Sequence, residues 1–212
     1  MKLAFALVLA ASLGGCFLFR TDDAERCQPG RTVVLGSQDD VTGFAGCKHA
    51  SGLTIRTGAT IDLSPLRELE VITGDLVIGP TVGIDEVALN GLVSVGGAVR
   101  VARNPSLRGL FLPRLVESGR VAIDGNHALT TIALPRITSI KGTLIVTDSP
   151  ALELVSADQL VTIGHELVLL DAPKLALVQL TRLVSVEAVR VERDPKLPAE
   201  LVQQWKQKAI TP

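Results

Sequence analysis

The sequence predicts a mainly β protein, built as a parallel β-solenoid of about seven coils of 22–23 residues with a short capping helix at each end. Three observations support this fold class. A short apolar motif recurs at a fixed spacing, turn residues recur between its copies, and aromatic residues make up only 3% of a chain that is 47% hydrophobic. A core of thin stacked coils has room for Leu, Ile and Val but little room for rings.

Composition excludes several other classes of protein. The 212 residues carry 21 basic and 22 acidic side chains, so the net charge is −1. A nucleic-acid binder would be basic and would offer aromatic rings for stacking, so no nucleic-acid partner is expected. A disordered chain would contain fewer aliphatic residues. A protein that crosses a membrane several times would show several long apolar runs.

The recurring motif is a tripeptide in which two apolar residues flank one variable residue. Its first residues are 22 or 23 positions apart over six steps. An alternating tripeptide is typical of a short strand with two residues inward and one outward. One coil cannot bury its own apolar edge, so coils stack and their strands pair in parallel. The copies are Leu53-Thr54-Ile55, Leu76-Val77-Ile78, Val99-Arg100-Val101, Val121-Ala122-Ile123, Leu144-Ile145-Val146, Leu167-Val168-Leu169 and Val189-Arg190-Val191.

Turn residues keep the same spacing as the tripeptides. We expect the glycines and the Asn/Asp turns to supply a positive or preset φ where the chain changes direction. The corner glycines are Gly74, Gly97, Gly119 and Gly142. The turns are Asn104-Pro105, Asp124-Gly125-Asn126, Ser149-Pro150, Ala172-Pro173 and Asp194-Pro195.

Both ends of a solenoid need a cap over the apolar edge of the last coil. Residues 27–52 are the predicted N-terminal cap, with a capping-box-like start at Ser37 and a short helix over Val41–Phe44. Residues 53–197 carry the repeats. Residues 198–212 form the predicted C-terminal cap, with a helix from Pro198 to Ala209. Leu201, Val202, Trp205 and Ala209 fall on one face of that helix, so Trp205 is expected to seal the last coil.

The first sixteen residues predict export and a lipid anchor. Lys2, an apolar stretch and small residues form a secretory signal over residues 1–15. Leu13-Gly14-Gly15-Cys16 resembles the lipobox of bacterial lipoproteins, which implies cleavage before Cys16 and its lipidation. The alternative is an ordinary signal peptide with a chance cysteine. Residues 16–26 would then be the lipidated cysteine and a tether to the solenoid.

The same segment predicts where the protein is located. Lipidation implies a membrane partner through the N-terminal lipid and a position in the cell envelope. Phe17, rather than an acidic residue, follows Cys16. In a Gram-negative cell this resembles sorting to the outer membrane or the cell surface.

Cys27 and Cys47 remain when Cys16 carries lipid. An even number of cysteines in an exported chain favours a disulfide between them. The alternative is a two-cysteine metal site, but no further His or Cys lies at ligand spacing around either residue.

The chain resembles receptor L-domains over roughly residues 27–197. The resemblance rests on Cys27, Val33-x-Leu35, Ser37-x-x-Asp40, Cys47 and the copy Leu69-Glu70-Val71-Ile72-Thr73-Gly74-Asp75-Leu76-Val77-Ile78. It implies a right-handed, leucine-rich-repeat-like β-solenoid with a disulfide-linked N-terminal cap. Ser118-Gly119 and His165 depart from the pattern. The family has no shared catalytic residues to carry over.

No catalytic motif, metal site or cofactor site is predicted. His49, His127 and His165 occupy different repeat columns, so they are expected on the surface and apart from one another. Asp124, Gly125 and Asn126 could hold a cation weakly, but an ordinary turn explains them. Some parallel β-helices degrade glycans with paired carboxylates, yet the outward positions here show no such pairs on successive coils. We therefore expect a protein that is not an enzyme.

The outward residues predict a binding surface. Ala122, Ile145, Val168 and Leu170 would form an exposed apolar strip bordered by Arg100, Arg120 and Arg190. Exposed apolar surface with an arginine rim is typical of protein interfaces; the alternative is that β-branched residues simply favour sheet faces. The expected function is a non-catalytic, lipid-anchored binding or scaffolding module with a protein or glycan partner. A structural envelope lipoprotein without a ligand and a glycan-active enzyme are the alternatives. Val168→Glu is expected to weaken capture of a partner with little effect on the melting temperature.

Overall fold

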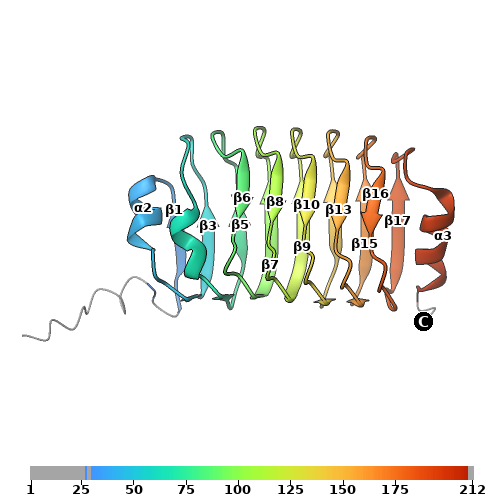
Figure 1. Cartoon of the computed structure of the whole chain (residues 1–212), viewed down its shortest axis with the longest axis horizontal. Coiled ribbons are helices and arrows are strands. Elements are labelled where there is room, and N and C mark those ends of the chain that lie inside the picture. The colour runs from blue at the N-terminus through green and yellow to red at the C-terminus, as the bar shows by residue number, and fades with distance from the viewer. Residues whose placement is uncertain (1–26, 28–29, 210–212) are drawn as a thin grey trace, which may run out of the picture.

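The computed structural model describes residue 27 and residues 30–209, and it forms a β-solenoid of about seven turns. The coils stand side by side from β1 to β17, and the helices α2 and α3 lie at opposite ends of the stack (Figure 1). Every strand pair recorded between neighbouring coils is parallel. The predicted fold class is therefore confirmed.

The solenoid has three faces, because most coils carry strands at three places rather than at the single place that the tripeptides predict. The long face consists of β1 (Thr32–Leu35), β3 (Gly52–Ile55), β5 (Leu76–Ile78), β7 (Ser94–Ala102), β9 (Glu117–Asp124), β12 (Leu144–Thr147), β15 (Glu166–Leu170) and β17 (Ala188–Glu192). The second face is the five-stranded sheet of β6 (Glu86–Ala88), β8 (Gly109–Phe111), β10 (Thr131–Ala133), β13 (Leu154–Ser156) and β16 (Leu177–Gln179). The third face comprises β2 (His49–Ala50), β4 (Val71–Ile72), the first residues of β7 and β9, β11 (Ser139–Ile140) and β14 (Thr162–Ile163).

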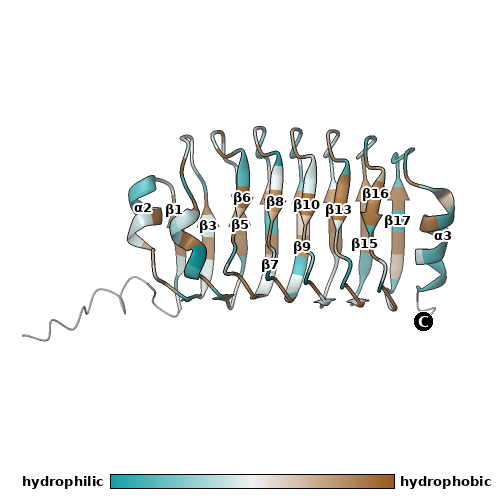
Figure 2. Ribbon diagram, viewed as in Figure 1, coloured by the Kyte–Doolittle hydropathy of each residue, from teal (hydrophilic) through white to brown (hydrophobic). Residues whose placement is uncertain are grey.

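The core is almost wholly aliphatic, as the composition predicts. On the long face, Leu144 and Val146 point inward and are buried, whereas Ile145 between them is only half-buried. Figure 2 shows hydrophobic residues along the strands and hydrophilic residues on the end helices. Among the described residues, the aromatic members of the buried cluster are Phe44 and Trp205, which belong to the two end caps. Rings are therefore placed where the coils stop rather than between them.

The helix of the N-terminal cap begins earlier than the sequence predicts. Helix α2 spans Gln38–Gly43 instead of Val41–Phe44. The predicted capping box explains the start: the Ser37 hydroxyl accepts a hydrogen bond from the Asp40 amide at 3.2 Å, and the Asp40 carboxylate accepts one from the Ser37 amide at 2.9 Å. In the next coil the 3-10 turn η1 (Ser64–Glu68) stands in place of a second-face strand, with a proline in its first turn.

The C-terminal helix seals the last coil as predicted. Helix α3 spans Ala199–Gln207, and Pro198 is its N-cap rather than part of its first turn. Trp205 is 1% exposed and belongs to the core cluster, against which Leu201, Val202 and Ala209 pack. The amphipathic pattern of this segment thus identified the correct face of the helix.

The corner glycines serve a different purpose from the one that we expected. None of the four, Gly74, Gly97, Gly119 and Gly142, has a positive φ. Instead, the backbone of the preceding coil passes close beside them: a Cβ on Gly119 would lie 2.6 Å from the carbonyl oxygens of Gly96 and Gly97. Glycine is required here because adjacent coils approach too closely for a side chain.

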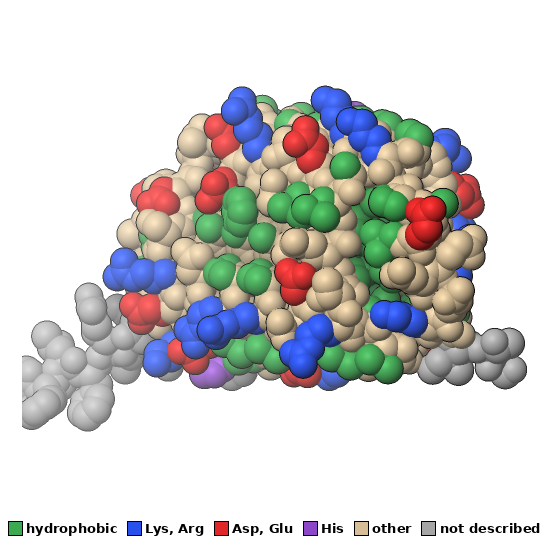
Figure 3. All heavy atoms as spheres, turned by 45° about the vertical axis from the view of Figure 1, so that its right-hand side comes forward, with side chains coloured by type: hydrophobic (Ala, Val, Ile, Leu, Met, Phe, Trp, Pro, Cys, Tyr) green, Lys and Arg blue, Asp and Glu red, His purple; other side chains and the backbone are tan. Residues whose placement is uncertain are grey.

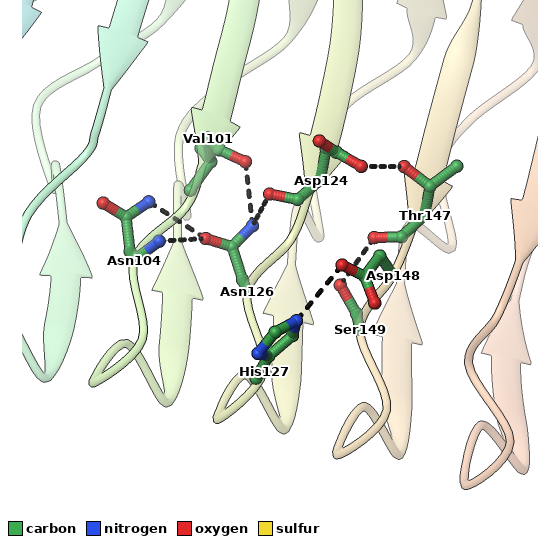
Figure 4. Close-up of polar contacts among 8 residues, drawn as sticks. All are labelled: Val101, Asn104, Asp124, Asn126, His127, Thr147, Asp148 and Ser149. Atoms are coloured by element: carbon green, nitrogen blue, oxygen red, sulfur yellow. Dashed lines mark hydrogen bonds and ion pairs between the residues drawn. The ribbon is translucent and has the colours of Figure 1, made fainter.

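A column of buried polar residues runs along the corner that follows the long face. It contains Thr81, Asn104, Asn126, Ser149 and Asp194, with Ala172 between the last two. Asn126 accepts hydrogen bonds from the amide and the side chain of Asn104, at 3.1 and 3.0 Å (Figure 4). Asn104 accepts in the same way from the amide and hydroxyl of Thr81, at 3.0 and 2.9 Å. Side chains that the sequence identified only as turn formers therefore join consecutive coils.

Asp194 is the member of this column that is not fully hydrogen-bonded. Its Oδ1 accepts from the Ala172 amide at 2.7 Å, but its buried Oδ2 has no partner among the described residues. The side chain is 7% exposed. Burial raises the pKa of this carboxyl above its ordinary value, the Ala172 amide lowers it, and the neighbouring Asp171 charge raises it further. The last coil thus buries a carboxyl where the coils of Asn104 and Asn126 bury a carboxamide.

Asp194→Asn is expected to stabilise the protein at neutral pH by about 1 kcal/mol, since a neutral amide replaces a desolvated carboxylate. Its Nδ2 would donate to the Leu169 carbonyl, which is in register with the carbonyls that Asn104 and Asn126 use. A raised folded pKa means that the native protein is most stable below the unfolded pKa of this carboxyl and loses stability as pH rises through the folded value.

Denaturant unfolding across this pH range tests the prediction. The gap between wild type and Asp194→Asn should be small near pH 4 and should widen toward neutral pH. Asp85→Asn, at an exposed position, is a matched control whose stability should not follow that curve. A pH-independent difference for Asp194→Asn would contradict the proposed cause.

Candidate interface on the long face

The predicted candidate residues do lie together. Arg100, Ala122, Ile145, Val168 and Arg190 are paired in register across β7, β9, β12, β15 and β17, one residue in each strand. They form a single row that crosses the long face. Arg120 lies two positions before Ala122 in β9, and Leu170 lies two positions after Val168 in β15, so both flank this row. The tripeptide spacing alone therefore predicted the register correctly.

The apolar part of the row is less exposed than we expected. Val168 is only 4% exposed and Leu170 only 9%, although neither belongs to the core cluster. Both face outward by strand alternation, and the adjacent strands place Ile145 and Arg190 on either side of Val168. Neighbours on the same sheet face are close enough to cover a side chain. The expected exposed strip is thus reduced mainly to Ala122 and Ile145, which are half-buried.

On the face in view in Figure 3, hydrophobic side chains form small separate patches between charged side chains. Because Val168 is covered by its neighbours, Val168→Glu is now expected to lower stability, unlike the expectation from the sequence alone. A charge at this covered position would have to displace its neighbours or lose hydration.

The arginine rim is partly neutralised. Arg100 pairs with Asp75 and Arg190 pairs with Glu192, each at 3.7 Å. Arg120 is exposed and has no ion-pair partner among the residues that the structure describes. Exposed pairs of this kind contribute little to stability. Arg120, which flanks the row beside Ala122, is therefore not neutralised by an ion pair among the described residues, whereas an arginine–carboxylate pair lies at each end of the row.

One flanking residue is buried rather than outward. Strand alternation places Ala98 on the outward side of β7, next to Val99, but it is 6% exposed, and its amide donates to Asp75 at 2.8 Å. The register shifts between Val95 and Ala98, where β7 turns from the third face to the long face. A bulge of this kind re-aims the side chains that follow it.

The three histidines are exposed and far apart in the repeat, as predicted. His127 contacts Asp148 at 3.1 Å, and His165 contacts Glu187 at 2.9 Å. Asp124 accepts a hydrogen bond from the Thr147 hydroxyl at 2.6 Å (Figure 4). Within the described part of the chain, no group of three or more His, Cys, Asp or Glu residues is arranged to hold a metal ion.

The two candidate cysteines of the cap are joined. Cys27 and Cys47 form a disulfide with their Cα atoms 5.5 Å apart, which favours the disulfide over the metal-site alternative. The lipidation candidate Cys16 lies outside the described residues, as do the predicted signal peptide (1–15) and tether (16–26). Residues 27 and 30–209 contain no helix that is both long enough and apolar enough to cross a membrane.

Comparison of the chain with protein-family models, with curated proteins and with solved structures finds no match. Any assignment of function therefore rests on the sequence motifs and on the geometry of the faces.

Sequence reasoning missed Arg103 and Asp148, two exposed residues at the turns that follow β7 and β12. They share a repeat column with Gly125, Asp171 and Arg193, and the four non-glycine members all have positive φ. The regular spacing of these residues can be read from the sequence. Their shared left-handed backbone conformation, which places their side chains at one corner, is known only from the structure.

Proposed function

We propose that the protein is a lipid-anchored module of the bacterial cell envelope that binds or scaffolds a protein or glycan partner through its long face, without catalysis. The anchor would be the acylated Cys16, most simply at the outer membrane or cell surface of a Gram-negative cell. The module would be the solenoid that follows the tether.

The N-terminal sequence supports the anchor. A charged start, an apolar stretch and a lipobox-like Leu13-Gly14-Gly15-Cys16 are what lipoprotein processing requires. The Cys27–Cys47 disulfide agrees with an exported protein. The receptor L-domain resemblance adds a family of ectodomains and surface lipoproteins to this proposal, and the solenoid fold is compatible with it.

The observation that carries the binding proposal is the row on the long face. Ala122 and Ile145 lie side by side in register, Arg120 beside them has no charged partner within the described residues, and ion pairs lie at both ends of the row. A small apolar centre with a polar margin is the usual anatomy of a transient protein interface. The parallel sheet beneath holds these side chains in fixed positions, which lowers the entropic cost of binding.

Ile145→Glu tests the proposal better than Val168→Glu, because Ile145 is half-buried and can accommodate a charge by turning it to solvent. We expect this variant to lose at least about tenfold in affinity for the partner. The partner is to be captured by photocrosslinking in intact envelopes, with purified protein on a glycan array run in parallel. The stability of the variant should change by no more than about 1 kcal/mol.

Thr54→Glu is the matched control. Thr54 lies in the same register row, beside Val77, but at the N-terminal end of the solenoid. It should retain capture. Equal capture by both variants and wild type would exclude the long-face row as the interface and favour a structural lipoprotein without a discrete ligand. Cleavage of a polysaccharide by wild-type protein would favour the glycan-active alternative.

The anchor has its own measurement. Mass spectrometry of the mature protein should find Cys16 as the acylated first residue. An unmodified Cys16 within a longer chain, or a cut elsewhere, would overturn the proposed localisation without affecting the interface test.

A further inference from the structure

A polar notch of about 450 Å³ opens at the corner where the strands of the long face end. Arg103, Pro105, Asp124, Gly125, His127 and Asp148 line it. These residues come from three consecutive coils, since they follow β7, β9 and β12 in turn. Figure 4 shows His127 and Asp148 directed toward one another across neighbouring coils, beside Asp124 and Thr147. The notch does not depend on whether the long face is an interface.

The repeat itself explains why the notch exists. From β7 onward, each coil places one residue with positive φ at this corner, and in chain order these are Arg103, Gly125, Asp148, Asp171 and Arg193. In the last two coils the side chains of this column meet, and Arg193 binds Asp171 through two nitrogens. Asp171 lies in the coil before Arg193, whereas the coil after Arg103 has Gly125 in this column, which has no side chain. The notch is the gap that this glycine leaves between Arg103 and Asp148.

The walls of the gap carry opposite charges. A Cβ built on Gly125 would lie 3.7 Å from Cγ of Arg103 and 3.8 Å from an Asp148 carboxylate oxygen. Arg103 is exposed and has no hydrogen-bond or ion-pair partner for its guanidinium among the residues described. On the other wall, the Thr147 hydroxyl binds one oxygen of Asp124 at 2.6 Å. The second Asp124 oxygen is left for another donor.

This pattern selects among ligands. A lone anion would bind Arg103 but would be repelled by Asp124 and Asp148. A lone cation, including a metal ion, would be attracted by Asp124 and Asp148 but repelled by the Arg103 guanidinium. A molecule with a carboxylate and an ammonium a few ångströms apart satisfies both walls. Arg103 would bind the carboxylate. The second oxygen of Asp124 would receive the ammonium, together with the Asp148 oxygen that does not contact His127.

We propose that this notch binds the amino-carboxylate group of an α-amino acid. Because the charges are exposed, the expected dissociation constant is on the order of millimolar. Arg103 has a left-handed backbone with φ 58°, and its Cγ lies at the edge of the gap.

Glycine is a suitable probe, since it is the simplest amino-carboxylate and has no chirality. Backbone amide resonances of the full chain, labelled with ¹⁵N, are followed at neutral pH as glycine is added. We expect saturable shifts centred on Gly125 and His127. N-Acetylglycine lacks the ammonium and glycinamide lacks the carboxylate, so each should bind at least about tenfold more weakly.

Gly125→Asp is the decisive variant. It places a carboxylate in the gap that this glycine leaves, and Asp148 and Asp171 already adopt the same positive φ. The new side chain should pair with Arg103, leave the amide spectrum folded and weaken glycine binding at least about tenfold. Arg103→Gln should weaken binding to a similar extent by removing the cation alone, so the test does not depend on how one variant folds.

Arg193→Gln is the matched control, because it removes the other arginine of the same column outside the notch. Its glycine affinity should equal that of wild type. Three results would each overturn the proposal: equal shifts with glycine and N-acetylglycine, undiminished binding by Gly125→Asp, or no saturable shift of the notch amides in wild type.

Discussion

Replacing Asn126 with alanine is expected to lower the free energy of unfolding by about 4 kcal/mol, the largest single-residue effect that we predict. The Asn126 side chain is fully buried. It accepts from the amide and side chain of Asn104, and it donates to the Val101 and Asp124 carbonyls at 2.8 and 3.1 Å. Alanine would remove all four of these hydrogen bonds, leave the buried backbone amide of Asn104 without its acceptor, and open a cavity between coils.

Denaturant unfolding of Asn126→Ala measures this loss directly. Asn90→Ala is the matched control, since Asn90 is an exposed turn residue of the same type and should change stability by no more than about 0.5 kcal/mol. Similar losses in the two variants would mean that the buried column does not hold the coils together.

Removing the Cys27–Cys47 disulfide is expected to lower stability by about 3 kcal/mol, because the closed loop spans 20 residues and restricts the unfolded chain. The bridge fastens the start of the described chain beside β2 and α2. Without it the strand β1, which pairs on one side only with β3, would be the first of the long face to detach.

The measurement compares unfolding midpoints with and without a reducing agent. Wild type should shift to lower denaturant when reduced, whereas the double variant Cys27→Ala/Cys47→Ala should start at the lower midpoint and should not respond. Alanine at position 47 loses part of a buried side chain, so the reductant response of wild type is the cleaner of the two values. An unchanged wild-type midpoint after complete reduction would contradict the expected role of the bridge.

Much of this architecture could be predicted from the sequence because stacked coils repeat one chemical environment. The tripeptides predicted the register of the long face, and the Ser37 capping box predicted a helix in the N-terminal cap. The amphipathic pattern around Trp205 predicted the C-terminal helix. Each of these signals is local, or it repeats at one spacing, and so it survives in a single sequence.

Other features depend on contacts between coils that no local pattern carries. The strands of the second face are three residues long, and their single inward residues, such as Val87 and Leu110, resemble scattered core positions. The low exposure of Val168 results from its neighbours in adjacent strands. The role of Gly119 follows from a passing backbone in the previous coil. In each case the feature depends on a residue about 23 positions away, in the adjacent coil. The side of the chain on which that residue lies is known only from the folded structure.

The buried polar column is interrupted at Ala172, so the coils before and after it are not joined equally by side-chain hydrogen bonds. Side-chain bonds link consecutive coils from Thr81 through Asn126. Within this buried column, Ser149 then bonds in its own coil, to the Thr147 carbonyl, and the next side-chain bond between coils is made by Asp194. In a linear array each coil is stabilised by its immediate neighbours, so a weak junction sets the boundary of a cooperative unit. We expect the solenoid to fray from its C-terminal coils, while the N-terminal coils, next to the proposed anchor, stay closed longest.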